Sequence, residues 1–495
     1  MEKHERLAPR LSGPYRPKYH FSPPYGWMND PCGPVYFEGE YHLFYQWNPN
    51  GITWGLPSWG HAVSIDMIHW QDLPVALEPD DSGSIFSGTV VVDHNDTSGF
   101  FSGKAGLVAI YSCHGSGESQ HIAYSSDRGR TWQKYSNNPV LPDRPGKEKW
   151  DFRDPRVFRY GPLGLWVMIV GGGQYRIYHS HDLLQWDFVS ELGVFEEFPD
   201  LFSVPVEDES GVCKWVLSVA GYGYYIGEFD GYSFKAESSY RFADYGFSWQ
   251  AAYVFNNMPD LRTVWIAWMR DGCKGPTETW RNNMSLPREL TLRRTPEGLV
   301  MAQRPVSEIT ALYRKHISLP SGDLIPGCNP LDGIHIGCFD LELEVEIEPG
   351  AEMVLWLRKG GNAGTAIRYN SRSNIVSVDT LYAGAPDMAG LEVSLLNQFF
   401  DARPVLAFAR GYHAYYNPES KLLKLRVLVD ECSVEVFVGE GNPVFSNTIY
   451  PPDDSCGLAV EVNRTGCRLV CCEVWELSSV PGLAVTNSTG EECSL

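Results

Sequence analysis

Three short acidic segments hold the residues whose types and spacing suit chemistry. Asp30 lies in Trp27-Met-Asn-Asp-Pro-Cys-Gly33, Asp154 in Asp151-Phe-Arg-Asp-Pro155, and Glu197 in Phe195-Glu-Glu-Phe-Pro-Asp200. Each segment leads into an apolar run typical of a strand, and its Asn, Asp, Pro or Gly residues favour turns. Two carboxylates on either side of one glycosidic bond can cleave it, because one attacks the anomeric carbon while the other protonates the leaving oxygen. The pattern therefore indicates glycoside hydrolysis.

The neighbours of these carboxylates favour the same chemistry. Arg153 can keep Asp154 ionised and can offer a fork of donors to ligand hydroxyls. Glu197 has a second carboxylate, Glu196, beside it and aromatic residues around it, conditions that raise a pKa and suit a general acid. Taken singly, each segment also fits an ordinary acidic loop or a structural Arg–Asp turn. Three of them before separate strands favour one shared site.

The elements that must position these residues are short strands rather than helices. Runs rich in Val, Ile, Tyr, Trp and Phe, such as 106–112, 165–170 and 214–219, are bounded by turn residues. A turn motif also recurs, as Ser64-x-Asp66 with Trp70, Ser125-x-Asp127 with Trp132, Ser180-x-Asp182 with Trp186, and a weaker copy at Asp230. A period near 50 residues in an all-β chain predicts about five or six propeller blades of about four strands each. The inner edges of such blades meet at one axis, where the carboxylates would come together.

The pattern changes after about residue 303. We expect a propeller over 1–303, a linker with one short helix over 304–328, a β-sandwich over 329–480 and a loose tail over 481–495. The sandwich prediction rests on alternating runs such as Leu341-Glu-Leu-Glu-Val-Glu-Ile-Glu348, which are typical of half-buried strands. Three roles are open for this second domain: packing against the propeller, forming a homodimer, or shaping the rim of the pocket.

Charge and composition exclude several classes of partner. The net charge is −21 with no Lys/Arg-rich run, which argues against nucleic acid and anionic membranes and fits a neutral ligand. No run of about 18 apolar residues predicts a membrane span. The charged N-terminus shows no signal peptide and the 12 Cys residues form no dense framework, so we expect a cytoplasmic protein with reduced thiols, or a secreted one if the sequence lacks its leader.

Several motifs, in order along the chain from about Tyr15 to Leu477, resemble glycoside hydrolase family 32, the invertases, inulinases, levanases and related fructosyltransferases. They are Trp-Met-Asn-Asp-Pro at 27–31, Tyr-His-Leu-Phe-Tyr-Gln at 41–46, Trp-Gly-His-Ala at 59–62, Phe-Ser-Gly at 86–88, Phe-Arg-Asp-Pro at 152–155, Glu-x-Pro-Asp at 197–200, Trp280-Arg281, Ser-Leu-Pro-Arg-Glu-Leu at 285–290 and Ser-Val-Glu-Val-Phe at 433–437. The resemblance implies an all-β chain, with a five-bladed β-propeller followed by a β-sandwich.

The same resemblance implies residue roles and a substrate class. Asp30 would be the nucleophile, Glu197 the acid/base and Asp154 the stabiliser of the transition state. The residues that match the lining of the family's fructose pocket are Asn29, Gln46, Trp54, Phe86, Ser87 and Arg153. The implied activity is hydrolysis of terminal β-D-fructofuranosides with retention, which requires the two catalytic carboxyl groups to lie about 5–5.5 Å apart. No metal and no organic cofactor is required.

Three departures from the family pattern leave alternatives open. Cys32 replaces Asn in the first motif, as in some fungal members that transfer fructose. Phe198 replaces Cys after the acid/base. The family's Trp-Met-x-Asn-Trp becomes Trp-Met-Arg-Asp-Gly at 268–272, so that a ring near the sugar is missing or supplied by Trp280. The alternatives are a fructosyltransferase, a catalytically silent fructan-binding protein, and a related inverting hydrolase of arabinosides.

Overall fold

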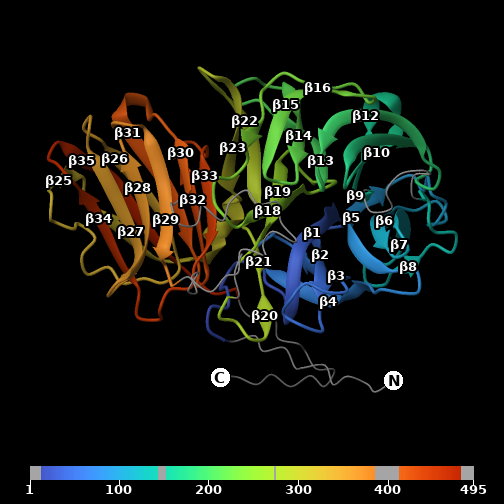
Figure 1. The fold of residues 1–495 in the computed structure, drawn as a ribbon, viewed down its shortest axis with the longest axis horizontal. Coiled ribbons are helices and arrows are strands. Elements are labelled where there is room, and N and C mark those ends of the chain that lie inside the picture. Colours follow the sequence, from blue (N-terminus) through green and yellow to red (C-terminus); the bar gives the residue numbers. More distant parts are fainter. Residues whose placement is uncertain (1–12, 143–151, 272–274, 385–411, 481–495) are drawn as a thin grey trace.

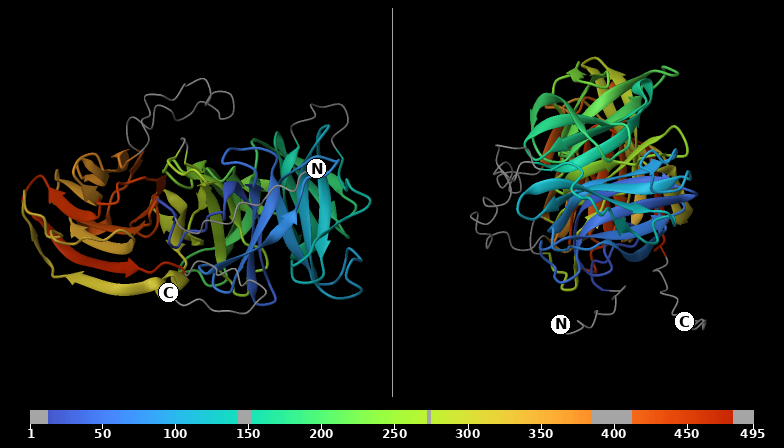
Figure 2. Two further views of the ribbon diagram at one scale, coloured as in Figure 1. Left: turned by 90° about the horizontal axis from the view of Figure 1, so that it is seen from below. Right: turned by 90° about the vertical axis from the view of Figure 1, so that its right-hand side faces the viewer.

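The protein consists of two β-rich units that lie side by side (Figures 1 and 2). The computed structural model describes residues 13–142, 152–271, 275–384 and 412–480. Strands dominate both units, and the only helices among these residues are the short 3-10 helices η1 (Gly161–Leu163), η2 (Ser307–Leu312) and η4 (Glu419–Lys421). None of the helices in these ranges is long and apolar enough to cross a membrane.

The N-terminal unit contains five antiparallel sheets in chain order. The first has β1 (Gly26–Phe37), β2 (Glu40–Asn48), β3 (Ser58–Ser64), β4 (Trp70–Leu77) and the short β20 (Trp280–Arg281); the second β5 (Ser84–Asp93), β6 (Gly106–His114), β7 (Glu118–Ser125) and β8 (Gln133–Lys134); the third β9 (Arg153–Tyr160), β10 (Leu165–Gly171), β11 (Gln174–Ser180) and β12 (Asp187–Phe195). The fourth has β13 (Pro199–Pro205), β14 (Cys213–Val219), β15 (Gly223–Phe229), β16 (Phe234–Ala236) and β17 (Arg241–Phe242); the fifth β18 (Trp249–Val254), β19 (Thr263–Met269), β21 (Asn283–Met284), β22 (Arg288–Thr295) and β23 (Gly298–Pro305).

These sheets form a closed ring around one axis (Figure 1). The first strands of neighbouring sheets contact one another in order, β1 with β5, β5 with β9, β9 with β13, β13 with β18, and β18 with β1. The strand β20 also pairs in parallel with β1, which joins the end of the unit to its beginning. Gly33 permits the approach of the first two sheets, because its φ is +53° and a Cβ there would lie 2.2 Å from the Val90 nitrogen. The predicted propeller is confirmed.

The repeated Ser-x-Asp motif forms the turn between the third and fourth strands of its sheets. Ser64, Ser125 and Ser180 each donate a hydrogen bond from Oγ to the Asp two residues later, at 3.0, 2.8 and 3.1 Å. The same Asp side chains accept backbone N–H groups of the turn, so each motif satisfies donors that would otherwise lack partners. The repeat therefore marks the sheet period, as the sequence predicted.

The C-terminal unit is a sandwich of two antiparallel sheets. One contains β24 (Tyr313–Leu319), β25 (Gly322–Leu324), β26 (Phe339–Glu346), β31 (Leu422–Val429), β32 (Ser433–Val438), β33 (Val444–Thr448) and β35 (Cys467–Leu477), and the other β27 (Glu352–Gly360), β28 (Ala363–Asn370), β29 (Ile375–Tyr382), β30 (Tyr412–Tyr415) and β34 (Gly457–Val462). The alternation in β26 buries Leu341, Leu343 and Val345 in the core between the sheets. The predicted sandwich is confirmed.

The connection between the two units differs from the predicted linker over 304–328. β23 extends to Pro305, η2 follows, and β24 already pairs with β35 of the sandwich from Tyr313 onward. β25 pairs with the same strand. Apolar and polar residues alternate only weakly in this segment because β24 is half exposed. The sequence pattern therefore did not predict these two strands. The predicted tail over 481–495 lies outside the described residues.

A cluster of fully buried charges joins the propeller to the sandwich. Arg288 of β22 forms ion pairs with Asp244 (3.0 Å) and with Glu435 of β32. His20 contacts Glu435 at 2.7 Å and Asp430 at 2.9 Å. Desolvation opposes charge in this cluster, yet hydrogen bonds that the His20 ring donates to Asp430 and Glu435 raise the pKa of His20 to about 9. Burying such charges is tolerable only because each has partners, so the sandwich packs against the propeller through a specific contact.

Candidate active site

Irregularities in the inner strands of three sheets place the candidate side chains. The pairing of β1 with β2 shifts around Asp30, that of β5 with β6 shifts around Ser87, and that of β9 with β10 shifts around Asp154. Asp154 also has a positive φ of +61°. A bulge re-aims the side chains of the strand that carries it. The contacts described next show that these three bulges direct their polar residues to one place.

A directional chain of hydrogen bonds ends on Asp30. Trp27 Nε1 donates to Asn29 Oδ1 (3.0 Å), and Asn29 Nδ2 donates to Gln46 Oε1 (2.8 Å). Gln46 Nε2 donates to Ser87 Oγ (2.6 Å), and Ser87 Oγ donates to Asp30 Oδ2 (2.7 Å). Each bond polarises the next, so the chain stabilises the ionised form of the last acceptor. Three residues predicted to line the pocket, Asn29, Gln46 and Ser87, therefore orient Asp30.

Burial and charge act against the ionisation of Asp30. Desolvation is the largest effect, and together with the charge of Glu197 it raises the pKa of Asp30 to about 6, while the hydrogen bond from Ser87 lowers that pKa. Above this value the carboxylate is ionised and available for attack. Asp30 and Glu197 thus lie close enough for their charges to interact.

Asp154 is buried and tightly held. Its backbone N–H donates to Ser112 Oγ (2.9 Å), and its Oδ2 accepts the backbone N–H of Phe198 (3.2 Å). Burial, with the charges of Glu197 and Asp30, raises the pKa of Asp154 well above its usual range, against the opposing effect of Arg153. The hydrogen bond from Phe198 fixes this carboxylate relative to the strand that follows Glu197.

Arg153 stands among three carboxylates. Its Nη2 donates to Glu197 Oε2 (3.1 Å), its Nε lies 3.8 Å from Asp154 Oδ2, and its Nη1 lies 3.4 Å from Glu118 Oε1. Glu118 is 2% exposed and also accepts the backbone N–H of Phe152 at 2.8 Å. Glu118 therefore holds both the Arg153 side chain and the backbone at Phe152, the residue that precedes Arg153.

Glu197 lies between β12 and β13 and keeps access to solvent. Its side chain is 39% exposed, which lets it approach a leaving group. Tyr175 donates its hydroxyl to the Glu197 carbonyl (2.9 Å), and the Glu197 backbone N–H donates to Glu196 Oε1 (3.2 Å). The neighbouring Glu196 thus supports the backbone at Glu197.

Aromatic rings form one wall of the site. Trp54, in the loop between β2 and β3, is 54% exposed and meets Phe86 edge to face at a centroid distance of 6.2 Å. Phe86 is stacked on His114 at 4.4 Å with an interplanar angle of 7°. His114 Nδ1 lies 3.4 Å from Glu118 Oε1, so the wall is connected to the carboxylate that holds Arg153. An exposed ring beside polar groups offers a face for a sugar.

Sequence reasoning missed four residues of this site: Ser112, His114, Glu118 and Tyr222. Burial raises the pKa of Tyr222 to about 12, and the charges of Glu197, Glu196 and Asp30 add to this effect, which places Tyr222 beside the carboxylates. Glu118 lies in Gly-Ser-Gly-Glu-Ser at 115–119, a segment that has only the composition of a polar turn. No local signal marks these residues, because their role comes from packing against other sheets.

The structure also places three residues that the departures from the family pattern concern, Cys32, Phe198 and Trp280. Cys32 is fully buried, and its thiol donates to the Asp30 carbonyl (3.5 Å), so it does not face an acceptor. The Phe198 ring packs edge to face on Tyr253 at 5.0 Å. Trp280 is 4% exposed beneath Arg16, whose guanidinium lies 4.5 Å from the ring centroid. The expectation that Trp280 could supply a sugar-stacking ring is therefore wrong.

Known proteins resemble this chain over nearly its whole length. A levanase of Bacillus subtilis is 39% identical over 96% of this chain and 72% of its own length. An extracellular exo-inulinase of Aspergillus awamori is 34% identical over 89% of this chain and 90% of its own length. The crystal structure of exo-inulinase from that fungus superposes with a TM-score of 0.84 at 30% identity, and the match covers 95% of this chain and 100% of that structure's chain.

A fructofuranosidase of Schwanniomyces occidentalis, solved in complex with fructosylnystose, gives a TM-score of 0.79 at 28% identity, with 94% of this chain and 98% of its own covered. The description "Glycosyl hydrolases family 32 N-terminal domain" matches residues 20–305, and "Glycosyl hydrolases family 32 C terminal" matches residues 313–476. These spans coincide with the propeller and the sandwich. The chain belongs to glycosyl hydrolases family 32 and carries both of its domains.

Proposed function

We propose that this protein is a retaining β-fructofuranosidase that hydrolyses terminal β-D-fructofuranosides, such as sucrose, fructo-oligosaccharides and inulin- or levan-type chains. The observation that carries the proposal is that Arg153 contacts both Glu197 and Asp154, while Asp30, at the end of a hydrogen-bond chain, lies close enough to Glu197 for their charges to interact. The names of the relatives, levanase and exo-inulinase, support the substrate class.

Asp30 is the proposed nucleophile. Its carboxylate attacks the anomeric carbon of the fructosyl unit while Glu197, in its protonated form, gives a proton to the leaving oxygen. A fructosyl-enzyme ester forms and the glucose or shortened chain departs. Glu197 then accepts a proton from water, which attacks the same carbon and releases fructose with retained configuration. This sequence requires the two carboxyl groups to lie about 5–5.5 Å apart.

Asp154 and Arg153 act on the sugar rather than on the bond that breaks. Asp154 is the proposed acceptor for fructose hydroxyls, and its fixed position gives those hydrogen bonds their geometry. Arg153 balances the negative charge of the site and offers further donors. Trp54 and Phe86 form the proposed apolar wall against which the sugar packs. No step in this scheme needs a metal or an organic cofactor.

A product profile on sucrose, inulin and levan tests the proposal, with nuclear magnetic resonance used to identify the first anomer released. We expect β-fructofuranose first, equal fructose and glucose from sucrose, and loss of at least about 10³-fold in kcat for Asp30→Asn. Glucose in excess over fructose at high sucrose would indicate transfer to a second sugar. Inverted product, activity on arabinosides alone, or an Asp30→Asn variant as active as the unaltered protein would overturn the assignment.

Location and assembly form a separate part of the proposal. One relative is an extracellular enzyme by name, which favours export over the cytoplasmic location predicted from the N-terminus. Activity in the culture medium against activity in the cell extract distinguishes the two. The homodimer, one of the roles left open for the second domain, is tested by size-exclusion chromatography with light scattering, in which a mass of about 56 kDa means a monomer.

A further inference from the structure

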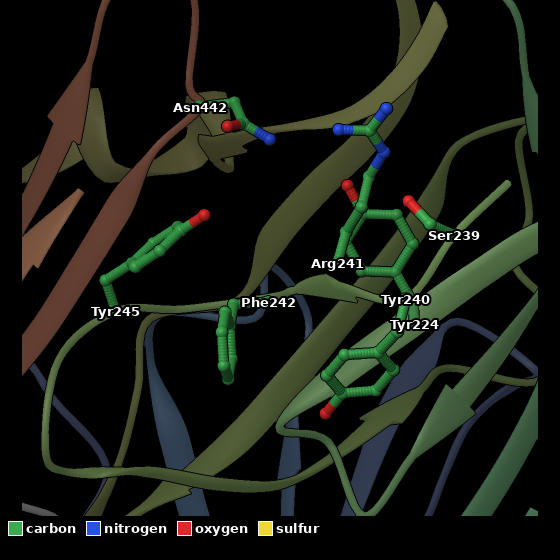
Figure 3. Close-up of a pocket in the computed structure, with 7 residues that line it drawn as sticks. All are labelled: Tyr224, Ser239, Tyr240, Arg241, Phe242, Tyr245 and Asn442. Atoms are coloured by element: carbon green, nitrogen blue, oxygen red, sulfur yellow. The ribbon is translucent and has the colours of Figure 1, made fainter. Parts of the chain in front are cut away.

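A second pocket lies between the fourth sheet of the propeller and the turn that connects β32 to β33 of the sandwich. Its lining residues are Tyr224 of β15, Arg241 and Phe242 of β17, Ser239 and Tyr240 before β17, Tyr245 after it and Asn442 from the sandwich (Figure 3). None of these lining residues is among the residues described for the candidate active site. The pocket is therefore separate from the site described above.

Four of the seven residues that line this pocket are aromatic. Tyr240 and Phe242 meet edge to face at 5.7 Å, and Phe242 meets Tyr245 at 5.6 Å. Tyr240 is 38% exposed and Phe242 is 54% exposed, although both are large aromatic residues. Tyr245 is held in place because its backbone N–H donates to Val444 of the sandwich at 2.8 Å. Exposed rings on a rigid frame gain free energy when a ligand covers them.

The polar groups of the pocket retain capacity for hydrogen bonds. The hydroxyls of Ser239 and Tyr245 have no partner among the described residues, and Figure 3 shows the Tyr245 hydroxyl directed toward the space that Asn442 and Arg241 border. Asn442 donates from Nδ2 to the Met301 carbonyl (2.9 Å), which leaves its own carbonyl oxygen as an acceptor. Arg241 Nη2 donates to the Glu297 carbonyl (2.9 Å), and its remaining N–H groups include further donors.

Charge and size narrow the class of ligand. No carboxylate lines the pocket, which disfavours a cation, and Arg241 is its one cationic lining residue, whereas anion sites generally gather several donors or charges. The cavity measures about 170 Å³, below the about 300–1,000 Å³ of pockets that enclose drug-sized ligands. Tyrosine and serine hydroxyls, an amide and a guanidinium around aromatic residues suit one neutral ring that carries hydroxyls.

We propose that this pocket is a second saccharide site, which holds an inner sugar unit of a fructan chain away from the bond that is cleaved. The inference rests on the proposed function for its choice of sugar. A polymer then contacts the protein at two places, and the second contact raises the local concentration of chain ends near the carboxylates. Sucrose is too short to use the pocket, so its hydrolysis is independent of it.

The test compares Phe242→Ala and Arg241→Gln with Tyr415→Ala, a matched control that removes a 67% exposed tyrosine from the sandwich. We expect KM for inulin or levan to rise about 3- to 10-fold in the two pocket variants, as expected for loss of one stacking or hydrogen-bonding group. The kcat and KM for sucrose should stay unchanged in all three variants. Equal polymer and sucrose kinetics across the set would overturn the proposal.

Binding without turnover separates this inference from the proposed function. The Asp30→Asn protein is run in native gels that contain inulin or levan, with and without Phe242→Ala. The site is supported if the polymer retards the Asp30→Asn protein, if adding Phe242→Ala abolishes this retardation, and if adding Tyr415→Ala preserves it. This result counts even if the unaltered protein hydrolyses no fructoside. Retardation that is the same in both variants, or competition by inorganic phosphate in place of oligosaccharide, overturns it. Thermal unfolding of each variant identifies any loss of the fold.

Discussion

Replacing Ser87 with Ala removes the last donor of the chain that ends on Asp30, and we expect the acid limb of the pH–activity profile to move upward. The Ser87 hydroxyl lies 2.7 Å from Asp30 Oδ2 and stabilises the ionised carboxylate. Burial raises the pKa of Asp30 to about 6 even with this bond in place. Removal of the bond favours the neutral form further, so the change has a definite sign.

The structure allows the size of this shift to be worked out. A hydrogen bond to a charged group contributes about 1.5–3 kcal/mol, and one pKa unit corresponds to about 1.36 kcal/mol. The pKa of Asp30 should therefore rise by about one to two units in Ser87→Ala. Because attack needs the carboxylate, kcat/KM should fall about 10- to 100-fold near pH 5 and change little near pH 8.

The assay is kcat/KM for sucrose measured from about pH 4 to about pH 8.5. Ser87→Thr serves as the matched control, because it keeps the hydroxyl and should keep the acid limb within about half a unit of its original position. Thermal unfolding at one pH checks that both variants are folded. An acid limb that stays in place in Ser87→Ala, or a loss of activity that is the same at every pH, would refute the reasoning.

Three further predictions concern the charges around the site and between the domains. Glu118→Gln should lower kcat for sucrose about 10-fold with little effect on KM, because the neutral amide still accepts the Phe152 N–H but no longer holds the charge of Arg153. Arg153→Lys should lower kcat/KM about 100-fold, because an ammonium cannot contact several carboxylates in the plane of a guanidinium. His20→Gln should lower the free energy of unfolding at about pH 6 by about 3–5 kcal/mol, because it leaves buried carboxylates without their partner. Because the pKa of His20 is raised, its protonation contributes fully to the free energy of unfolding below about pH 6.5, and this contribution is lost as the pH rises through about 9. The His20→Gln variant should therefore not show this loss of stability at high pH.

Each of these has an outcome that contradicts it. A rise in KM for Glu118→Gln at constant kcat would mean that Glu118 contacts substrate instead of positioning Arg153. An active Arg153→Lys enzyme would mean that a single positive charge suffices. Chemical denaturation of His20→Gln between about pH 6 and 9 should converge with the unaltered protein at high pH, and a constant difference would show that His20 does not carry a proton in the folded state.

The local parts of the fold and of the site could be predicted from the sequence. The Ser-x-Asp turns depend on residues two to four positions apart, so their motif was sufficient to identify the sheet period. Alternation in 341–348 identified a half-buried strand for the same reason. The acidic segments around Asp30, Asp154 and Glu197 were found because each carries its own turn residues.

Contacts between distant parts of the chain could not be predicted. Ser87 lies 57 positions from Asp30, and Glu118 lies 35 positions from Arg153, and only the packing of successive sheets joins them. Trp280 matches a family motif, yet its burial beneath Arg16 is visible only in three dimensions. Strands β24 and β25 were missed because they bury too little surface to alternate clearly.

The sequence by itself determined which carboxylates could react, because the residue types that form a rigid turn are adjacent to them in the chain. Tertiary structure alone decided how those carboxylates are tuned. The pKa values of Asp30 and Asp154 depend on burial and on the charges and donors of other sheets, and Coulomb and hydrogen-bond energies depend on distance in space rather than on spacing in the chain. The second pocket follows the same rule, since Asn442 and Tyr240 approach each other only where the sandwich packs against the propeller.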